Sequence, residues 1–265
     1  MPRVSVLMPV FNGEQFLLAA IESILGQGFT GFEMIVVDDG STDNTPEILR
    51  SIRDSRLRLL RNERNLGIVA ALNRGLEYAS GEYICRMDAD DIALPGRLEQ
   101  QVSFLDANPK CVLVGTHARL IDDRGNEIGV EAPPASDAHI RRIMFVHNPF
   151  IHGSVMLRSS ALRAVGRYDD RFLHNEDYDL WLRIASLHSV ANLPEILVSR
   201  RIHGNAITVA HELELVRYRI RTLRHAILHY YRKPAYLVHV VRPVLAYAYR
   251  RIRKALRSTS LPFVV

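Results

Sequence analysis

Short apolar runs alternate with segments of helical spacing through the first half of the chain, and this alternation limits the fold more than any other feature. The apolar runs, typical of buried strands, lie at 4–8, 32–37, 57–60, 83–87 and 112–115. The segments typical of helices lie at 14–25, 68–79 and 95–107. A further helix is expected to have Thr45 as its N-cap and Pro46 as its first residue. Strands separated by such helices predict βαβ units. We therefore expect an α/β fold with a Rossmann-like, mostly parallel central sheet flanked by helices.

The second half of the chain has a less regular pattern. Segments 119–121 and 127–130 flank a turn-forming stretch and predict a hairpin. Further on, helices are expected at 138–146 and 178–187, and a strand at 196–202. A basic helix is expected at 212–230, where Leu213, Val216, Ile220, Leu223 and Ile227 form one apolar stripe.

Composition is that of a folded protein rather than a disordered chain. The 265 residues are 48% apolar and 24% charged, which suffices for one large domain or a domain with an appendage. Cys85 and Cys111 lie far apart without metal-ligand spacing, which argues against a disulfide scaffold or a structural zinc site. No secretory signal and no apolar run of 18 residues is evident, so we expect a cytoplasmic protein.

Positive charge is concentrated in the C-terminal part. From residue 211 onward the net charge is +10, against +5 for the whole chain, so the remainder carries −5. This distribution does not predict a nucleic-acid partner. Three interpretations of the basic tail remain: it packs on the rest of the chain, forms a dimer contact, or makes peripheral contact with the inner face of an anionic membrane.

Two acidic segments directly follow expected strands. Asp88-Ala89-Asp90-Asp91 offers three carboxylates, which are hard ligands suited to Mg²⁺ or Mn²⁺; the alternative is a solvated acidic turn. Asp38-Asp39-Gly40 begins the second segment, which could otherwise be a turn and helix cap. In parallel sheets ligands bind beyond the carboxyl ends of the strands, so these segments predict a binding site there.

Five stretches together resemble glycosyltransferase family 2, whose members have the GT-A fold. They are VSVLMPVFNGE at 4–14, IVVDDGSTDNT at 35–45, RNLG at 64–67, GEYICRMDADD at 81–91 and NEDYDLW at 175–181. The resemblance implies a GT-A catalytic domain over 1–205, with a nucleotide-binding half at 1–115 and an acceptor-binding half at 116–205. It leaves 206–265 as a basic helical C-terminal extension.

The resemblance also implies roles for individual residues. Asp177 matches the general base, and Asp90 matches the acid that binds Mn²⁺ or Mg²⁺, with His203 as a further ligand. The positions matching the acceptor side are Glu176, Trp181 and His152, although a lone histidine is more often structural. The positions matching the nucleotide site are Pro9, Phe11, Asn12, Glu14, Asp38, Asn65 and Asp88.

The activity implied is inverting transfer of one sugar from a nucleotide-diphosphate sugar to an acceptor hydroxyl. UDP is expected from its frequency in the family, with dTDP or GDP as alternatives, and the acceptor is expected to be a glycan or lipid-linked molecule of the cell envelope. The QxxRW motif of processive synthases is missing, so one sugar per encounter is expected. The alternative is an inactive nucleotide-sugar-binding or membrane-associated regulatory protein. Oligomeric state is not predicted.

Overall fold

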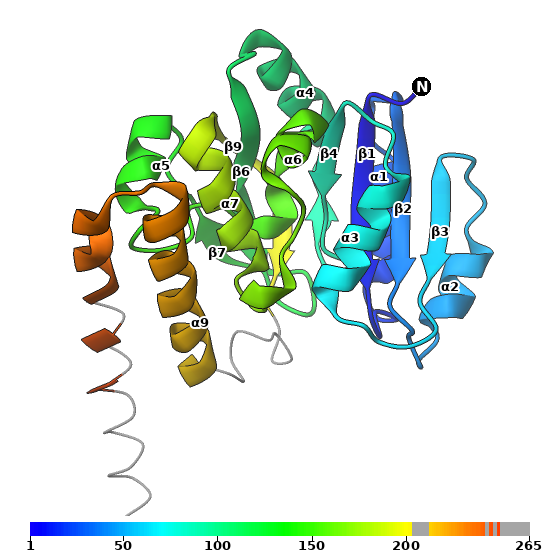
Figure 1. Ribbon diagram of the computed structural model, residues 1–265. Coiled ribbons are helices and arrows are strands. Elements are labelled where there is room, and N and C mark those ends of the chain that lie inside the picture. Colours follow the sequence, from blue (N-terminus) through cyan, green and yellow to red (C-terminus); the bar gives the residue numbers. More distant parts are fainter. Residues whose placement is uncertain (203–211, 242–243, 246–247, 250–265) are drawn as a thin grey trace, which may run out of the picture.

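The computed structural model describes residues 1–202, 212–241, 244–245 and 248–249, with the side chains of 212–215 left out. One sheet runs through the molecule in the order β3-β2-β1-β4-β8-β6-β9-β5, and β7 pairs with β6 (Figure 1). The parallel pairs are β1–β2, β1–β4, β2–β3 and β6–β9. The predicted α/β class is therefore confirmed.

The strands differ from the sequence predictions mainly in the second half. β6 is one long strand that joins the two strands predicted at 112–115 and 119–121, and of its long neighbour β9 only the C-terminal part was predicted. β5 and β8 were missed. The predicted hairpin is the turn between β6 and β7. The strands are β1 (Val4–Val10), β2 (Phe32–Asp38), β3 (Leu57–Arg61), β4 (Tyr83–Arg86), β5 (Ile92–Ala93), β6 (Cys111–Ile121), β7 (Glu127–Glu131), β8 (Met156–Arg158) and β9 (Ser189–Arg201).

Helices cover both faces of the sheet because alternate residues of each strand point to opposite sides. From β1, Leu7 packs in the cluster that includes residues of α3 and α7, whereas Val6 and Met8 pack with α1 and α4. Buried apolar layers therefore lie on both sides of β1. The helices are α1 (Leu17–Leu25), α2 (Thr45–Ser51), α3 (Ile68–Tyr78), α4 (Arg97–Ala107), α5 (Asp137–Ile143), α6 (Ser159–Val165) and α7 (Glu176–Leu187), with 3₁₀ turns η1 (His152–Ser154) and η2 (Asp170–Phe172).

Two helix starts correct the sequence predictions. α1 begins at Leu17 rather than residue 14, because the chain turns at Asn12, which has a φ of 52°. Thr45 is the first residue of α2 and Asn44 its cap, so the predicted cap is wrong by one residue. The Thr45 hydroxyl instead accepts a hydrogen bond from the Gly13 amide at 2.9 Å. Both differences arise from contacts between two loops that no local pattern records.

The described part of the basic tail packs against the rest of the chain. α9 (Glu212–His225) and the π-helical turn η3 (Ala226–Tyr230) lie beside α7 at one end of the molecule (Figure 1), and the 3₁₀ turn η4 (Pro234–Leu237) contacts η3. Leu223, Ala226 and Ile227 are buried in the same apolar cluster as α7. Within the described residues, no helix combines the length and apolar character needed to cross a membrane.

Candidate active site

The carboxyl ends of three neighbouring strands, β1, β2 and β4, form one edge of the sheet. β1 pairs in parallel with β2 on one side and with β4 on the other, so the loops that follow these strands meet. Those loops contain residues 11–16, 39–44 and 87–91. The two acidic segments predicted to share an edge therefore do so.

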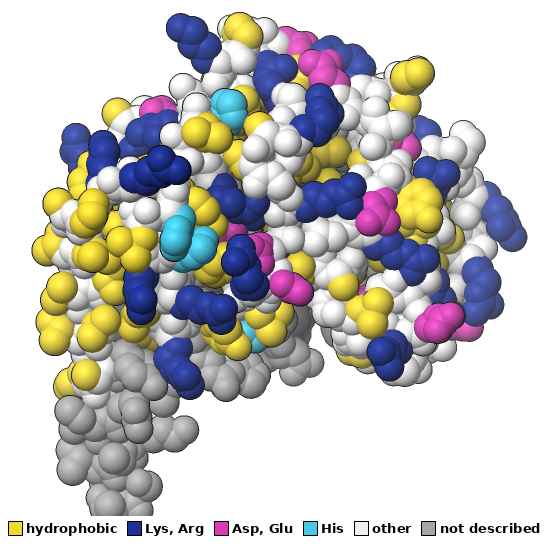
Figure 2. Space-filling model, in the orientation of Figure 1, with side chains coloured by type: hydrophobic (Ala, Val, Ile, Leu, Met, Phe, Trp, Pro, Cys, Tyr) yellow, Lys and Arg dark blue, Asp and Glu magenta, His cyan; other side chains and the backbone are white. Residues whose placement is uncertain are grey.

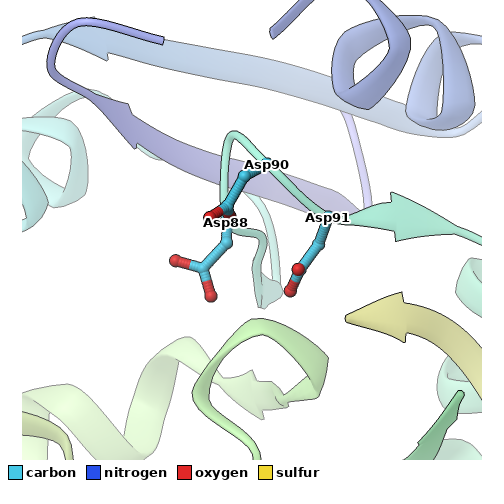
Figure 3. Close-up of side chains that lie close together, drawn as sticks. All are labelled: Asp88, Asp90 and Asp91. Atoms are coloured by element: carbon cyan, nitrogen blue, oxygen red, sulfur yellow. The ribbon is translucent and has the colours of Figure 1, made fainter. Parts of the chain in front are cut away.

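Three carboxylates gather in the loop after β4. Asp88, Asp90 and Asp91 each bring an oxygen to a group of atoms that lie within 4.8 Å of one another (Figure 3). Asp91 is 1% exposed; its Oδ1 accepts a hydrogen bond from the Arg201 amide at 2.8 Å, and its Oδ2 has no hydrogen-bond partner. Burial, followed by the charges of Asp88 and Asp90, raises the pKa of Asp91 well above its ordinary value. A buried carboxylate oxygen without a partner in such a group fits a bound divalent cation.

Gly153 in η1 closes one side of this acidic group. A Cβ atom at Gly153 would lie 2.7 Å from Asp91 Oδ2 and 2.8 Å from Asp88 Oδ2, so only glycine leaves these oxygens where they are. The β8 strand that follows η1 pairs antiparallel with β4, and this pairing holds η1 against the acidic loop. The sequence did not identify Gly153, although it lies between the predicted His152 and a buried strand.

Arg86 ends β4 as a buried cation directly before the acidic loop. Its side chain is 2% exposed and forms an ion pair with Asp88. The atom that pairs with Asp88 is Nη1, whereas Nε has no hydrogen-bond partner among the described residues. A buried, incompletely paired guanidinium is costly, so its place beside the acids indicates a role at the site. The signal in the sequence was an arginine at the end of an apolar strand, which was missed.

The loops after β1 and β2 are joined by hydrogen bonds. The Asn12 amide donates to Ser41 Oγ, and the Thr42 amide donates to Asn12 Oδ1, both at 2.9 Å. The Asn44 amide likewise donates to a carboxylate oxygen of Glu14 at 2.9 Å. Asn12 and Glu14, both expected at the nucleotide, therefore also bind the neighbouring loop.

The other residues expected at the nucleotide differ in exposure. Phe11 is 45% exposed, and Pro9 is half-buried at the end of β1. Asp38 is buried; its Oδ1 accepts from the Ser41 amide at 2.8 Å, and its Oδ2 lies 3.3 Å from Arg61 Nε. The exposed Phe11 ring could stack on a base, and the Asp38 carboxylate could accept hydrogen bonds from that base.

Asp39, rather than Asp38, organises the loop that contains Asn65. Its carboxylate accepts hydrogen bonds from the amides of Leu66 and Gly67 at 3.0 and 2.8 Å and from the Asn62 side chain. Asn65 is exposed, and its side-chain oxygen accepts from the Gly67 amide at 2.9 Å. The second acid of the Asp38-Asp39 pair thus has a structural role, which explains why the segment has more carboxylates than a turn needs.

Asp177 lies in the first turn of α7. Its Oδ2 accepts a hydrogen bond from Asn148 Nδ2 at 2.8 Å, and its Oδ1 accepts from the Tyr178 amide at 2.6 Å. Burial raises the pKa of Asp177, while these hydrogen bonds and the charge of Arg86 oppose the rise. An ionised carboxylate at a helix N-terminus is also stabilised by the helix dipole. Sequence reasoning missed Asn148, for which no local signal exists.

Glu176 is more deeply buried than its neighbour. Its Oε2 has no hydrogen-bond partner, and burial followed by the charge of Asp177 raises its pKa to about 7. The positive charge of Arg86 lowers the pKa of both Glu176 and Asp177. The same charge interacts electrostatically with Asp88 and Asp91. Arg86 is therefore within electrostatic reach of the acids on β4 and of the acids on α7.

His152 and Trp181 are packed against each other close to Arg86 and the acids of α7. His152 Nε2 lies 3.0 Å from the Tyr168 hydroxyl, and its ring meets Trp181 edge-on at 5.9 Å between centroids. Burial, and then the charge of Arg86, keeps the pKa of His152 well below its usual value, so the ring is neutral. Trp181 is 0% exposed, which gives no support to direct acceptor contact by its side chain.

His203 lies outside the described residues, so its predicted role as a metal ligand is not placed. The described strand that leads to it contributes Arg201 to the site. Arg201 Nε donates to the Asp90 carbonyl at 3.0 Å, and its guanidinium lies 4.2 Å from the centroid of the Phe16 ring. Arg201 thereby connects β9 to the loops after β1 and β4, a role that the sequence did not predict.

Comparisons with known proteins agree with this geometry. The family model described as Glycosyl transferase family 2 matches residues 5–166. The amylovoran biosynthesis glycosyltransferase AmsE of Erwinia amylovora is 36% identical over 211 residues, which cover 77% of this chain and 77% of AmsE. EpsE of Bacillus subtilis (strain 168), named as a glycosyltransferase, is 40% identical over 190 residues, covering 69% of this chain and 66% of EpsE. The match thus spans just under two thirds of EpsE.

Solved structures show the same fold at low sequence identity. Residues 1–349 of S. aureus TarS, in complex with UDP, superpose with a TM-score of 0.70 at 20% identity, covering 96% of this chain and 72% of that one. The mannosyltransferase PcManGT from Pyrobaculum calidifontis, in complex with GDP-Man and Mn²⁺, gives a TM-score of 0.64 at 20% identity, covering 98% and 77%. The expected GT-A fold is confirmed. Because the family model matches more than half of the chain and AmsE is similar over most of its length, this protein belongs to glycosyltransferase family 2.

Proposed function

We propose that this glycosyltransferase is a metal-dependent, inverting enzyme that moves one sugar from a nucleotide-diphosphate sugar to an acceptor hydroxyl. The observation that carries the proposal is the group of three carboxylates after β4, at the sheet edge where the loops of β1 and β2 also end. A leaving nucleoside diphosphate gains negative charge, which a cation held by carboxylates can offset.

The metal-binding role falls to Asp90, with Asp88 and Asp91 as the carboxylates beside it. Their oxygens are hard donors of the kind that Mn²⁺ and Mg²⁺ prefer, and the unpartnered Asp91 Oδ2 leaves one more acceptor for a cation. A bound Mn²⁺ or Mg²⁺ would supply charge stabilisation to the diphosphate. His203 remains a proposed further ligand.

Asp177 is the proposed general base. The acceptor hydroxyl must lose its proton as it attacks the anomeric carbon, and attack opposite the leaving group inverts that centre. Asn148 and the Tyr178 amide hold the Asp177 carboxylate in one orientation, so it can accept the proton without first reorienting. Glu176 and His152 are proposed to border the acceptor site.

UDP is the proposed carrier, supported by family frequency and by the UDP complex of TarS, a protein with the same fold. Phe11, Asn12, Glu14, Asp38, Asn65 and Asp88 are the proposed nucleotide contacts. A glycan or lipid-linked acceptor of the cell envelope is supported by the name of AmsE as an amylovoran biosynthesis enzyme. We propose a cytoplasmic location and transfer of one sugar per encounter.

A thermal-shift series tests the donor and metal sites first. UDP, GDP and dTDP would be added singly, each with and without Mn²⁺, and one nucleotide should raise Tm only when Mn²⁺ is present. Asp90→Asn should abolish this Mn²⁺-dependent rise. If Mn²⁺ makes no difference with any nucleotide, the chain is not a metal-dependent donor-binding enzyme.

The base assignment predicts a separate defect. Asp177→Asn should lower turnover by about 10²- to 10⁴-fold, the usual contribution of a general base, while the nucleotide-dependent rise in Tm persists. Asp170→Asn, which alters an exposed acid of the neighbouring turn η2, is the control and should keep wild-type turnover. Wild-type turnover in Asp177→Asn would refute the assignment.

Donor binding by the wild type without turnover of any acceptor would instead favour the alternative of an inactive regulatory protein.

A further inference from the structure

The outer face of α9 and η3 carries a groove of about 480 Å³ that the active site does not use. We call it the basic groove. Its lining consists of Arg217, Arg221 and Arg224 together with Ile220, Leu228 and a histidine pair, spaced so that they share one helical face. Among the described side chains, no carboxylate forms an ion pair with these three arginines. Figure 2 shows cationic and histidine side chains together over this part of the molecule.

Exposed apolar side chains follow the basic groove along the chain. We call Leu237, Val238 and Val241 the apolar ridge; Val238 is 65% exposed and Val241 is 51% exposed. Arg232 and Lys233, both exposed, lie between the groove and the ridge in sequence. Figure 2 shows hydrophobic side chains beside the cationic ones at this end of the molecule. Arginines that pair with no described carboxylate, next to exposed aliphatic side chains, form a surface that can attract both anionic groups and apolar chains.

We propose that the basic groove and the apolar ridge bind the surface of an anionic lipid bilayer. The arginines would contact lipid phosphate groups, to which guanidinium binds in bidentate geometry, and the ridge would enter the acyl boundary. Charge complementarity selects this occupant. Among the described side chains these arginines have no carboxylate ion-pair partner, so the face matches a uniformly negative surface better than a second copy of itself.

The surface is rigidly connected to the part of the chain that carries Asp177. The Tyr230 hydroxyl donates to Asp179 Oδ1 at 2.8 Å, and Leu223, Ala226 and Ile227 are buried against the same cluster as α7. Asp179 lies in the first turn of α7, as Asp177 does. Docking through the basic groove would therefore hold α7, and the site beside it, at a fixed height above the bilayer. The proposal itself does not depend on the proposed reaction.

Co-sedimentation of the full chain with vesicles tests the proposal. We expect binding to vesicles of phosphatidylcholine with 30% phosphatidylglycerol at low salt and no binding to pure phosphatidylcholine. Arg217→Gln, Arg221→Gln and Arg224→Gln combined should lower the partition coefficient on the order of a hundredfold, as expected from removal of three cations near an anionic surface. Val238→Ser with Val241→Ser should also weaken binding.

A charge-matched triple variant separates a local surface from a net-charge effect. Arg50→Gln, Arg53→Gln and Arg58→Gln remove three exposed cations near α2 and β3, at the opposite end of the molecule from α9 (Figure 1). This control should bind vesicles as the wild type does. All variants should keep the wild-type Tm and its rise with nucleotide and Mn²⁺, which separates loss of bilayer binding from loss of the donor site. Equal loss in the two triple variants, equal binding to neutral vesicles, or no binding by the wild type would each overturn the proposal.

Discussion

At the scale of single residues, the candidate site depends on close contacts between buried charged side chains and their neighbours. Gly153 leaves room for the oxygens of Asp88 and Asp91, and the charge of Arg86 offsets acids from both the loop after β4 and the start of α7. Buried ions are costly unless they are paired, so each of these side chains depends on the others. Substitutions here should change ion binding and protonation more than they change the fold.

Gly153→Ala should weaken Mn²⁺ binding. The added Cβ would come within 2.8 Å of two carboxylate oxygens, so at least one of them must move away from the metal position. We expect a loss of metal affinity of about tenfold or more, on the scale seen when groups that orient metal ligands are altered. Calorimetric Mn²⁺ titration measures it. Gly129→Ala is the matched control, because its Cβ would meet only Leu120 at an ordinary 3.8 Å; equal affinity in both variants would contradict the prediction.

Glu176→Gln should remove part of the pH dependence of stability. The pKa of Glu176 is raised from 4.5 to about 7 by burial and by Asp177, so the folded state holds a proton that the unfolded state releases between these values. The stabilisation is complete below about pH 4.5 and is lost as pH rises toward 7, up to about 3 kcal/mol. Urea unfolding at pH 4.5, 5.5 and 7 should show a flatter profile for Glu176→Gln. Parallel profiles for variant and wild type would argue against this protonation.

At the scale of elements, α7 connects the candidate site to the C-terminal segment. Its first turn holds Glu176 and Asp177 toward the site and Asp179 toward Tyr230 of η3. Asp179 is fully buried and also accepts a hydrogen bond from Arg183 Nε at 2.8 Å. One helix turn therefore carries both the proposed general base and a packing contact with the C-terminal segment.

Tyr230→Phe should destabilise the protein by about 1–3 kcal/mol, because it leaves a buried carboxylate oxygen of Asp179 without its donor. Chemical denaturation measures the change in the free energy of unfolding. Tyr236→Phe is the matched control: its ring packs at 5.3 Å from Phe145, and the phenylalanine keeps that ring contact. Both variants keep their aromatic ring, so an equal cost for Tyr236→Phe would show that loss of a tyrosine hydroxyl in this segment, rather than loss of the hydrogen bond to Asp179, causes the destabilisation.

At the scale of the whole molecule, part of the described tail shares an apolar cluster with α7. The expected boundary at 205/206 divides residues that share one apolar cluster with α7, and β6 continues across the expected boundary at 115/116. Deleting everything after residue 211 would therefore remove part of the core. Point substitutions are the better probe of this segment.

Ile227→Ser and Leu228→Ser should differ in their effect on stability, because the first residue lies on the buried face of the tail and the second on its exposed face. Ile227 is fully buried, so the serine removes core packing and buries a hydroxyl, at a cost of about 3 kcal/mol. Leu228 is exposed in the basic groove, and its replacement should change stability by less than about 0.5 kcal/mol. Thermal unfolding of both variants measures the contrast. Similar Tm values for the two would mean that the tail does not pack as described.

Local patterns in the sequence determined the strands and helices of the first half, the sheet class and the place of the acidic loops. Those properties follow from apolar periodicity and from the rule that parallel strands end on one edge, as Asp88 and Asp38 illustrate. The assignments of Asp177 and the nucleotide contacts came from the family resemblance and are still predictions. Tertiary structure alone decided that Asp39 holds the 62–67 loop, that Asn148 orients Asp177, and that Gly153 and Arg86 enclose the acidic group. These contacts join residues that are far apart in the chain, and no local propensity or spacing encodes which distant partners the folded backbone brings together.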